Sequence, residues 1–206
     1  MERSRFRRLH SLSGVVPLGA FLAFHLFVNS SAARGADAFN ATVHRLQQVP
    51  LMGLVEIVAL FLPLAFHGVG GLFVIAGSPV SAERSDPASR ALATLQRVTG
   101  VVLFFFILFH LWTARLVAFG DHEGLDLFHL MQAALASPWI RAAYVGGILA
   151  ATSHFSTGVY TFARTWGLAS SRPARIAVAV AAAAVFAILS ALGLRSVAAF
   201  LLPNPV

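Results

Sequence analysis

Three features of the sequence predict an all-α fold that crosses a membrane with five helices. Of the 206 residues, 58% are hydrophobic and only 11% are charged. A soluble domain is typically about 25% charged, so this chain has too few polar groups to cover a water-exposed surface. Its apolar residues fall into five blocks, each near the roughly 20 residues that a transmembrane helix needs. Backbone groups in lipid must find partners within their own segment, which makes each block a helix.

The predicted spans follow one another with short connections. Together they occupy nearly the whole chain, so residues 1–206 are predicted to form one transmembrane domain without a soluble active site. The segments between spans, including 30–50 and 119–137, are expected to be loops. In order, the spans are Leu12–Asn29, Leu51–Ala76, Leu92–Ala118, Pro138–Arg164 and Ala174–Phe200.

The distribution of arginine gives the predicted orientation. The formal net charge is +7, and every basic residue is Arg. Because these residues flank apolar spans, the charge favours membrane orientation over nucleic-acid binding. The positive-inside rule places the N-terminus in the cytoplasm and the C-terminus outside, in the inner membrane. The predicted cytoplasmic side carries Arg3, Arg5, Arg7, Arg8, Arg84, Arg90, Arg97, Arg164, Arg172 and Arg175, and the other side carries Arg34, Arg45, Arg115, Arg141 and Arg195 with the acidic Asp121, Glu123 and Asp126.

The first span has a second interpretation. A basic start followed by an apolar run also resembles a secretory signal peptide, with Ser30–Ala33 as a small-residue cleavage site. The similarity of this run to the third span favours a retained helix instead. The absence of Cys means that the chain alone holds neither a Cys-ligated zinc ion nor an iron–sulfur cluster.

Four histidines lie inside predicted spans, one on each of the first four: His25, His67, His110 and His154. Polar side chains within lipid are costly and usually functional. Internal repetition pairs them, because Phe24-His25-Leu26-Phe27 resembles Phe109-His110-Leu111-Trp112. His67 and His154 are each followed by Gly after four residues and by an aromatic residue two positions later.

Depth in the membrane supports the same pairing. At 1.5 Å per residue, His25 and His110 lie about 6–12 Å from the outer ends of their spans, and His67 and His154 lie about 24 Å from those ends. We therefore define an outer pair, His25 and His110, and an inner pair, His67 and His154. Two facing imidazoles in an apolar bundle suit haem iron, which takes axial His ligands. They are too few ligands for zinc or copper.

Four glycines are expected to make room for these cofactors. Gly71 and Gly158 share a helix face with the inner histidines and would let a macrocycle approach the backbone. Gly14 and Gly100, within the similar Ser13–Val16 and Thr99–Val102, lie about 15–16 Å inward of the outer histidines and would leave space for the inner ring. Helix contact through small residues is the alternative for all four glycines.

Charged groups near the span ends are candidates for haem and quinone contacts. Arg97, Arg164 and Arg8 could bind haem propionates, since Arg recognises carboxylates, although positive-inside charge alone would also explain them. His10 could contact a propionate or serve on the surface. Glu56 could exchange protons with a quinone or could snorkel to the interface.

These residues together resemble the dihaem cytochrome b anchor subunit of succinate dehydrogenase. The ordered four-His pattern is specific, extends over nearly the whole chain, and is shared by the anchor of some fumarate reductases. The matching segments are Arg8-Leu9-His10-Ser11, Gly14-Val15-Val16-Pro17, Phe24-His25, Leu62-Pro63-Leu64-Ala65-Phe66-His67-Gly68, Leu95-Gln96-Arg97-Val98-Thr99-Gly100 and Ser153-His154-Phe155-Ser156-Thr157-Gly158.

The resemblance implies that the chain joins a flavoprotein and an iron–sulfur subunit on the cytoplasmic side. It implies that electrons from succinate reach the inner haem, then the outer haem, and then a quinone, usually menaquinone. Some fumarate reductase anchors carry a Glu two residues before the fourth His that is tied to transmembrane proton transfer. Here that position is Thr152, which favours the succinate-oxidising direction.

Two other classes of membrane protein remain as alternatives. A cytochrome b anchor of a formate dehydrogenase or hydrogenase also uses few spans and His ligands, but the ordered motifs fit it less well. A transporter or proton channel could use the intramembrane histidines as a relay. Beyond the histidines, however, the spans offer such a protein only hydroxyl groups and Glu56.

Overall fold

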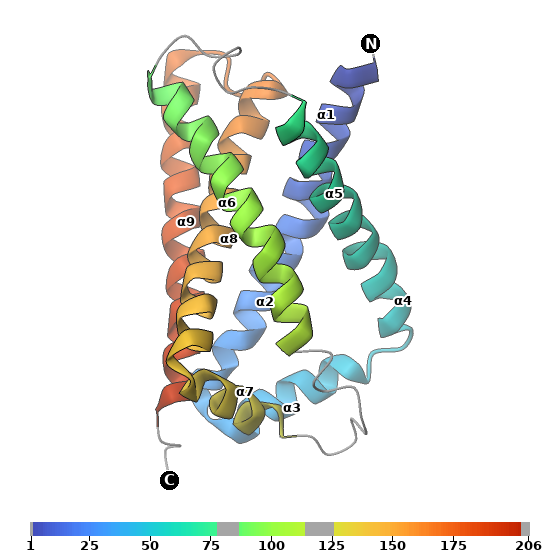
Figure 1. Cartoon of the computed structure of the whole chain (residues 1–206), viewed down its shortest axis with the longest axis vertical. Coiled ribbons are helices and arrows are strands. Elements are labelled where there is room, and N and C mark those ends of the chain that lie inside the picture. Colours follow the sequence, from blue (N-terminus) through green and yellow to red (C-terminus); the bar gives the residue numbers. More distant parts are fainter. Residues whose placement is uncertain (1, 78–86, 114–125, 203–206) are drawn as a thin grey trace.

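The computed structural model describes residues 2–77, 87–113 and 126–202. Within these ranges every regular element is a helix, which confirms the all-α prediction. Four helices are long and apolar enough to cross a membrane, and a fifth span results when the bent pair α7 and α8 is counted. Figure 1 shows the chain ends at opposite ends of the bundle, as an odd number of crossings requires. The end of the third predicted span (114–118), Arg84, Arg115, Asp121 and Glu123 lie outside the described residues.

The first span is one continuous helical rod. It consists of α1 (Glu2–Ser13), a π turn (Gly14–Leu18), α2 (Gly19–Asn29) and a 3-10 turn (Ser30–Arg34). The helix begins before the predicted start at Leu12, because apolar residues mark only the part in lipid while the basic turns before it are also helical. The π turn contains Pro17, which has no backbone N–H to donate and so interrupts the regular ladder.

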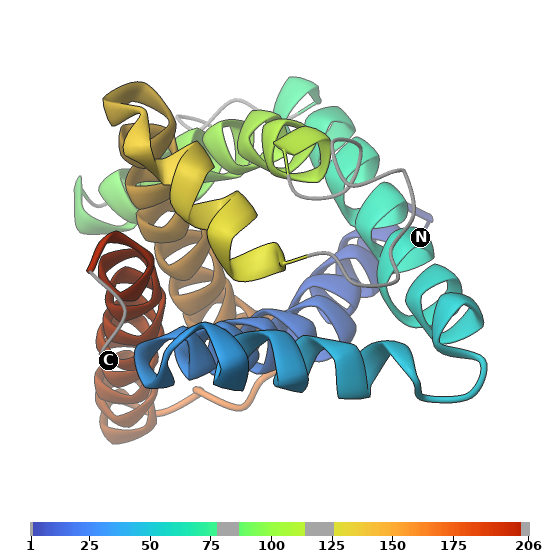
Figure 2. The ribbon, with the colours of Figure 1, turned by 90° about the horizontal axis from the view of Figure 1, so that it is seen from below.

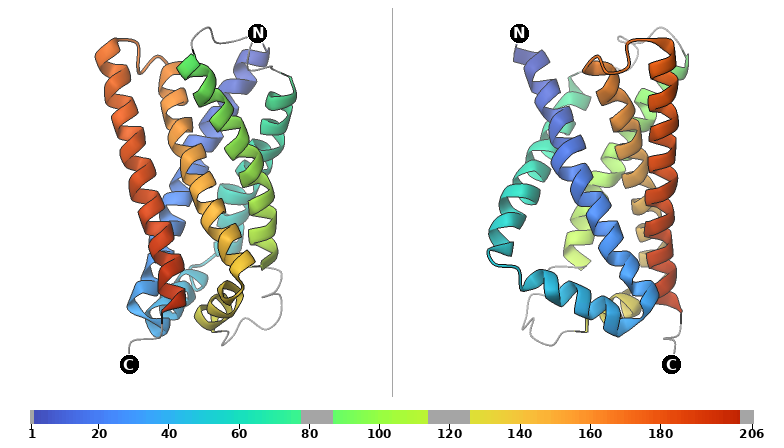
Figure 3. Two further views of the ribbon diagram at one scale, coloured as in Figure 1. Left: turned by 60° about the vertical axis from the view of Figure 1, so that its left-hand side comes forward. Right: turned by 180° about the vertical axis from the view of Figure 1, so that it is seen from behind.

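The other spans begin close to their predicted positions. α4 (Met52–Glu56) continues through a second π turn (Ile57–Phe61) into α5 (Leu62–Ala76), whose second residue is a proline. The remaining long helices are α6 (Pro87–Leu111), α8 (Pro138–Thr165) and α9 (Arg172–Leu201). The left view of Figure 3 shows α8 lying beside both α6 and α9, the two helices with which it makes extensive contact.

Two helices occupy segments that were expected to be loops. α3 (Ala36–Gln47) and α7 (Leu127–Ala136) lie across the end of the bundle that carries the C-terminus (Figure 2). Each is amphipathic, because apolar residues recur at helical spacing, such as Phe39 and Val43 in α3 and Phe128 and Leu135 in α7. The loop expectation is therefore wrong for these segments, which are too short to cross a membrane and instead cover the bundle.

The best-packed core lies under these two helices. The ring of Phe39 lies 6.2 Å from that of Phe128 and 5.1 Å from that of Phe200, which brings α3, α7 and α9 together. Phe128 is 1% exposed and Leu135 is 0% exposed. Along the spans, by contrast, large apolar side chains such as that of Phe73 face outward, as expected of a surface in contact with lipid.

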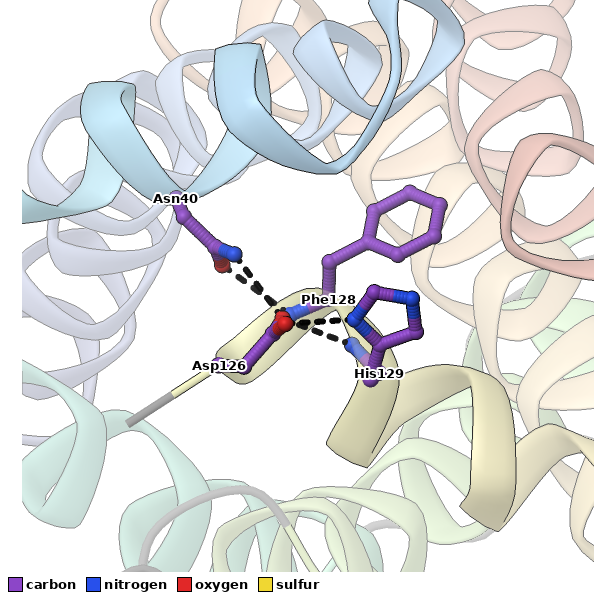
Figure 4. Close-up of polar contacts among 4 residues, drawn as sticks. All are labelled: Asn40, Asp126, Phe128 and His129. Atoms are coloured by element: carbon purple, nitrogen blue, oxygen red, sulfur yellow. Dashed lines mark hydrogen bonds and ion pairs between the residues drawn. The ribbon is translucent and has the colours of Figure 1, made fainter. Parts of the chain in front are cut away.

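A network of hydrogen bonds connects α3 to the start of α7 (Figure 4). Asn40 donates its amide to Asp126 Oδ1 at 2.8 Å, and its own oxygen accepts from the backbone N–H of Phe128 at 3.1 Å. Asp126 also caps α7 by accepting from the backbone N–H of His129 at 3.1 Å, and its Oδ2 lies 2.5 Å from Nδ1 of that residue. These hydrogen bonds, chiefly the one from Asn40, lower the pKa of Asp126 to about 2.

This shift predicts a pH dependence of stability that Asp126→Asn should remove. Because the folded pKa lies below the ordinary value of 3.8, the ionised cap stabilises the fold fully above about pH 4 and is lost as the pH falls through about 2. Asn keeps the capping oxygen but does not titrate. In thermal melts in detergent, the wild type should exceed the variant in Tm at pH 5, and the difference should shrink by pH 2. A difference independent of pH would contradict this assignment.

Candidate functional site

The structure brings the four intramembrane histidines together in two pairs. The ring centroids of His25 on α2 and His110 on α6 are 5.7 Å apart, and their planes are inclined by 79°. Those of His67 on α5 and His154 on α8 are 6.1 Å apart and inclined by 83°. All four side chains are at least partly buried among helices. These are the pairs that repetition and depth predict.

The centroid separation within each pair is of the size expected for two imidazoles that share one metal ion. With metal–nitrogen distances of about 2 Å on opposite sides of one ion, the ring centres would lie about 6.3 Å apart. Both observed separations are close to that value. Among the described residues, no group of three or more His, Asp or Glu side chains is arranged to hold a metal ion. Each pair brings two imidazoles together, and imidazole is a ligand that haem iron takes.

Hydrogen bonds set the orientation of the inner histidines. Nδ1 of His67 lies 3.0 Å from the backbone carbonyl oxygen of His10, and Nδ1 of His154 lies 3.0 Å from that of Gln96. A carbonyl accepts but cannot donate, so Nδ1 carries the proton in both rings. Nε2 is then left with the lone pair that can bind a metal. In His154, the side-chain amide nitrogen of Gln96 lies 3.3 Å from Nε2.

The outer histidines have side-chain partners. The amide nitrogen of Asn29 lies 3.3 Å from Nε2 of His25 and 2.8 Å from the carbonyl oxygen of the same residue, so it donates to a lone pair on Nε2. Nδ1 of His110 lies 3.3 Å from the hydroxyl oxygen of Tyr144 on α8. Nε2 of His25 therefore carries a lone pair that the Asn29 amide contacts, and Nδ1 of His110 has a hydroxyl beside it that can accept its proton.

Two of the predicted glycines allow the inner imidazoles to contact a neighbouring helix backbone. A Cβ atom at Gly14 would collide with the ring of His67, and one at Gly100 would lie 2.9 Å from Cε1 of His154. Because Gly100 and His110 are ten residues apart on α6, the two histidine layers are separated by about 15 Å along the helix.

The other two predicted glycines face different side chains. A Cβ at Gly71 would lie 3.3 Å from Nε2 of His10, and one at Gly158 would lie 3.6 Å from the side-chain nitrogen of Gln96. These glycines therefore face the residues whose carbonyl groups orient the inner histidines.

The inner layer is duplicated in the structure as well as in the sequence. One helix supplies a carbonyl group, then a hydroxyl three residues later, then the glycine. The partner helix supplies a histidine and a glycine four residues later. Ser13 Oγ lies 3.3 Å from Nδ1 of His67, and Thr99 Oγ1 lies 3.5 Å from Nδ1 of His154. The equivalent positions are His10 and Gln96, Ser13 and Thr99, Gly14 and Gly100, His67 and His154, and Gly71 and Gly158.

Comparison with known proteins places the chain in a family. Residues 78–192 match the family described as Succinate dehydrogenase/Fumarate reductase transmembrane subunit. The succinate dehydrogenase cytochrome b558 subunit of Bacillus subtilis (strain 168) is 40% identical over 197 residues, which cover 95% of this chain and 96% of that protein. The chain belongs to the succinate dehydrogenase/fumarate reductase transmembrane subunit family. With its apolar helices, it is a multi-pass membrane anchor of the inner membrane.

The three predicted arginines of this anchor lie at the end of the bundle that carries the N-terminus. The guanidinium carbon of Arg8 lies 5.7 Å from the ring centroid of Trp166, and that of Arg164 lies 5.9 Å from the ring centroid of Tyr160. Both arginines are exposed, whereas Arg97 on α6 is half-buried. The inner histidine pair lies nearer this end than the outer pair, since His154 contacts Gly100, which lies nearer the start of α6 than His110 does.

His10 and Glu56, the other two predicted residues, lie at different levels of the anchor. The His10 ring stacks on that of His67 with centroids 4.1 Å apart and planes inclined by 13°, and its Nε2 lies 3.0 Å from the His67 carbonyl oxygen. Glu56 is half-buried at the end of α4, toward the end of the bundle that α3 and α7 cover (Figure 1).

Sequence reasoning missed several residues that contact the histidines of this anchor. Thr99 and Gln96 lie within motifs that the sequence already singles out, and the correspondence of Thr99 with Ser13 is a signal that could have identified it. Asn29 lies one helical turn after His25, so its spacing was a weaker signal. Tyr144 lies far from His110 in the sequence and had no such signal.

Proposed function

We propose that the chain is the membrane anchor and electron-transfer subunit of a succinate:quinone oxidoreductase. It would pass electrons from an iron–sulfur subunit through two b haems to a quinone. That quinone would be menaquinone. The observation that carries this proposal is the set of four partly buried imidazoles in two pairs, together with the backbone carbonyls that hold the proton at Nδ1 of His67 and His154 and leave Nε2 with a lone pair.

The four histidines would hold the two cofactors. His67 and His154 would be the axial ligands of the inner haem, and His25 and His110 those of the outer haem. When bound, each haem would supply a one-electron carrier. The backbone carbonyls of His10 and Gln96 would keep the inner imidazoles in the binding tautomer and raise their basicity.

The glycines would support this inner site. Gly14 and Gly100 would let the two ligand rings lie against helix backbone, which fixes their positions without a competing side chain. Gly71 and Gly158 would leave space beside the rings for a macrocycle, with His10 and Gln96 at its edge.

Charged side chains at the two ends of the bundle would contact the haem propionates and the quinone. Arg97, Arg164 and Arg8, with His10, would bind propionate groups, since guanidinium recognises carboxylates bidentately. Glu56 would exchange protons with the quinone near the outer layer. The same basic end would face the flavoprotein and iron–sulfur subunits on the cytoplasmic side.

One buried residue supports the succinate-oxidising direction. Thr152 is 0% exposed, and its hydroxyl lies 2.8 Å from that of Ser190 on α9 and 2.9 Å from the carbonyl oxygen of Ile148. This position therefore holds a satisfied pair of hydroxyls between α8 and α9 and offers no carboxylate to carry protons. An anchor working as a fumarate reductase is the alternative direction.

Co-purification with a spectral readout tests the proposal. A tagged copy of the chain, purified from membranes of its own cells, should carry a flavoprotein and an iron–sulfur subunit. Succinate alone should then reduce most of the haem that dithionite reduces, and a menaquinone analogue should reoxidise it. Absence of succinate-oxidising subunits, or a haem spectrum that succinate leaves oxidised while dithionite reduces it, would overturn the proposal.

A further inference from the structure

Tyr144 lies between the outer ligand His110 and a threonine on the same helix as that ligand. Its hydroxyl oxygen is 3.3 Å from Nδ1 of His110 and 2.9 Å from Oγ1 of Thr113. The Tyr144 side chain is 6% exposed, and its ring packs edge-on against Phe106 and Phe109, with centroids 5.7 and 6.0 Å away. A buried hydroxyl is thus held at a ligand nitrogen by aromatic packing.

One direction of hydrogen bonding satisfies all of these contacts. Thr113 Oγ1 lies 3.1 Å from the carbonyl oxygen of Phe109 and 3.2 Å from that of His110, so its proton goes to a carbonyl of its own helix. Thr113 then accepts from the hydroxyl of Tyr144, which in turn accepts from Nδ1–H of His110. The opposite direction would protonate Nε2 of His110 and leave those carbonyls without the Thr113 donor.

We propose that Tyr144, supported by Thr113, is the positioning residue that fixes the tautomer of His110 and tunes the outer haem. This inference rests on the proposed function, because it assumes that His110 is an axial ligand. An acceptor at Nδ1–H raises the electron density of an imidazole and stabilises the oxidised metal. Removal of the hydroxyl should therefore make the outer haem easier to reduce.

The outer ligand differs in this respect from the inner ligands. Backbone carbonyls meet Nδ1 of His67 and His154, and no side-chain substitution removes a carbonyl. At His110 the acceptor belongs to a side chain. A single substitution can consequently change the outer haem while leaving the inner haem as an internal reference.

Tyr144→Phe in the intact complex tests the inference. The ring and its packing stay, and only the hydroxyl is lost. Redox titration should show a rise in the midpoint potential of the outer haem of up to about 59 mV, which is a tenfold change for a one-electron couple, with the inner haem unchanged. The outer haem is identified as the signal that His25→Ala removes. Thr113→Val should shift the same signal in the same direction by less, because the Tyr144 hydroxyl loses its acceptor.

Tyr160→Phe is the matched control. Tyr160 lies on the same helix but at the other end, beside Arg164, and its substitution should leave the outer potential unchanged. Two retained haems with an unshifted outer potential in Tyr144→Phe would overturn the inference and leave the proposed function intact. If Tyr144→Phe lost the outer haem, the Thr113→Val shift would decide: an upward shift supports the inference and no shift overturns it. A wild-type complex without haem would overturn the proposed function, and the inference with it.

Discussion

His67→Ala is expected to lower the haem content from two b haems per chain to one and to slow succinate-dependent quinone reduction by about 100-fold or more. The substitution removes one of the two imidazoles of the inner pair, whose centroids are 6.1 Å apart. The His10 ring stacks on that of His67, with centroids 4.1 Å apart. The pyridine haemochrome assay on the purified complex, together with quinone reduction, measures both effects.

Two further variants sharpen this experiment. Because His10 could move into the place of the missing ring, the double variant His67→Ala with His10→Gln removes that substitute ligand. Gln is the residue at the equivalent position 96, where its backbone carbonyl already bonds a histidine of the inner pair. A Gln at position 10 should therefore be accommodated in the same way. His44→Ala, at an exposed histidine on α3, controls for the loss of an imidazole elsewhere. Two haems retained in the double variant would show that His67 is not a ligand.

Gly100→Ala is expected to displace His154 and to weaken binding of the inner haem by about 10–100-fold. The added Cβ would lie 2.9 Å from Cε1 and 3.2 Å from Nδ1 of His154, so the ring must move and lose its bond to the Gln96 carbonyl. We expect a cost of about 1–3 kcal/mol from overpacking, although Ala is about 1 kcal/mol better than Gly in a helix interior. Haem content and the reduced-minus-oxidised spectrum report the loss.

Gly146→Ala is the matched control for this prediction. Gly146 lies within α8, and a Cβ there would have no neighbour within 4 Å. The helix propensity gain is then unopposed, and both haems should stay. Gly14→Ala should reproduce the effect of Gly100→Ala, through His67 instead of His154. Equal haem content in Gly100→Ala and Gly146→Ala would contradict the role given to the inner glycines.

The sequence predicted the pairing of the histidines because two independent signals agreed. The repeated sequence around His25 and His110 paired these residues, and their similar depth in the membrane gave the same pair. Depth follows from position in the span, because the rise per residue of a helix is known. The duplicated Ser13–Gly14 and Thr99–Gly100 were visible for the same reason. The sequence did not show which atoms these hydroxyls and glycines contact. Those contacts depend on how α1 is rotated against α5 and how α6 is rotated against α8.

Hydropathy alone accounts for the errors elsewhere in the fold. It marks the stretch that lies in lipid, so it placed the start of the first span at Leu12 although the basic residues before it are helical. It also missed α3, whose polar face lowers the mean hydropathy, and α7, which is apolar but only 10 residues long and so too short to be taken for a span. Tyr144 could not be predicted, because its distance from His110 in the sequence carries no information about their contact across α6 and α8.

The haem stoichiometry of the purified wild-type chain with its partners tests the central claim most directly. Pyridine haemochrome quantification against protein, combined with electron paramagnetic resonance of the oxidised sample, gives both the number of haems and their axial ligands. Two b haems per chain, each with two imidazole ligands, are expected from the paired histidines. A preparation that retains its partner subunits but carries no b haem, or only one, would contradict the assignment of the two histidine pairs.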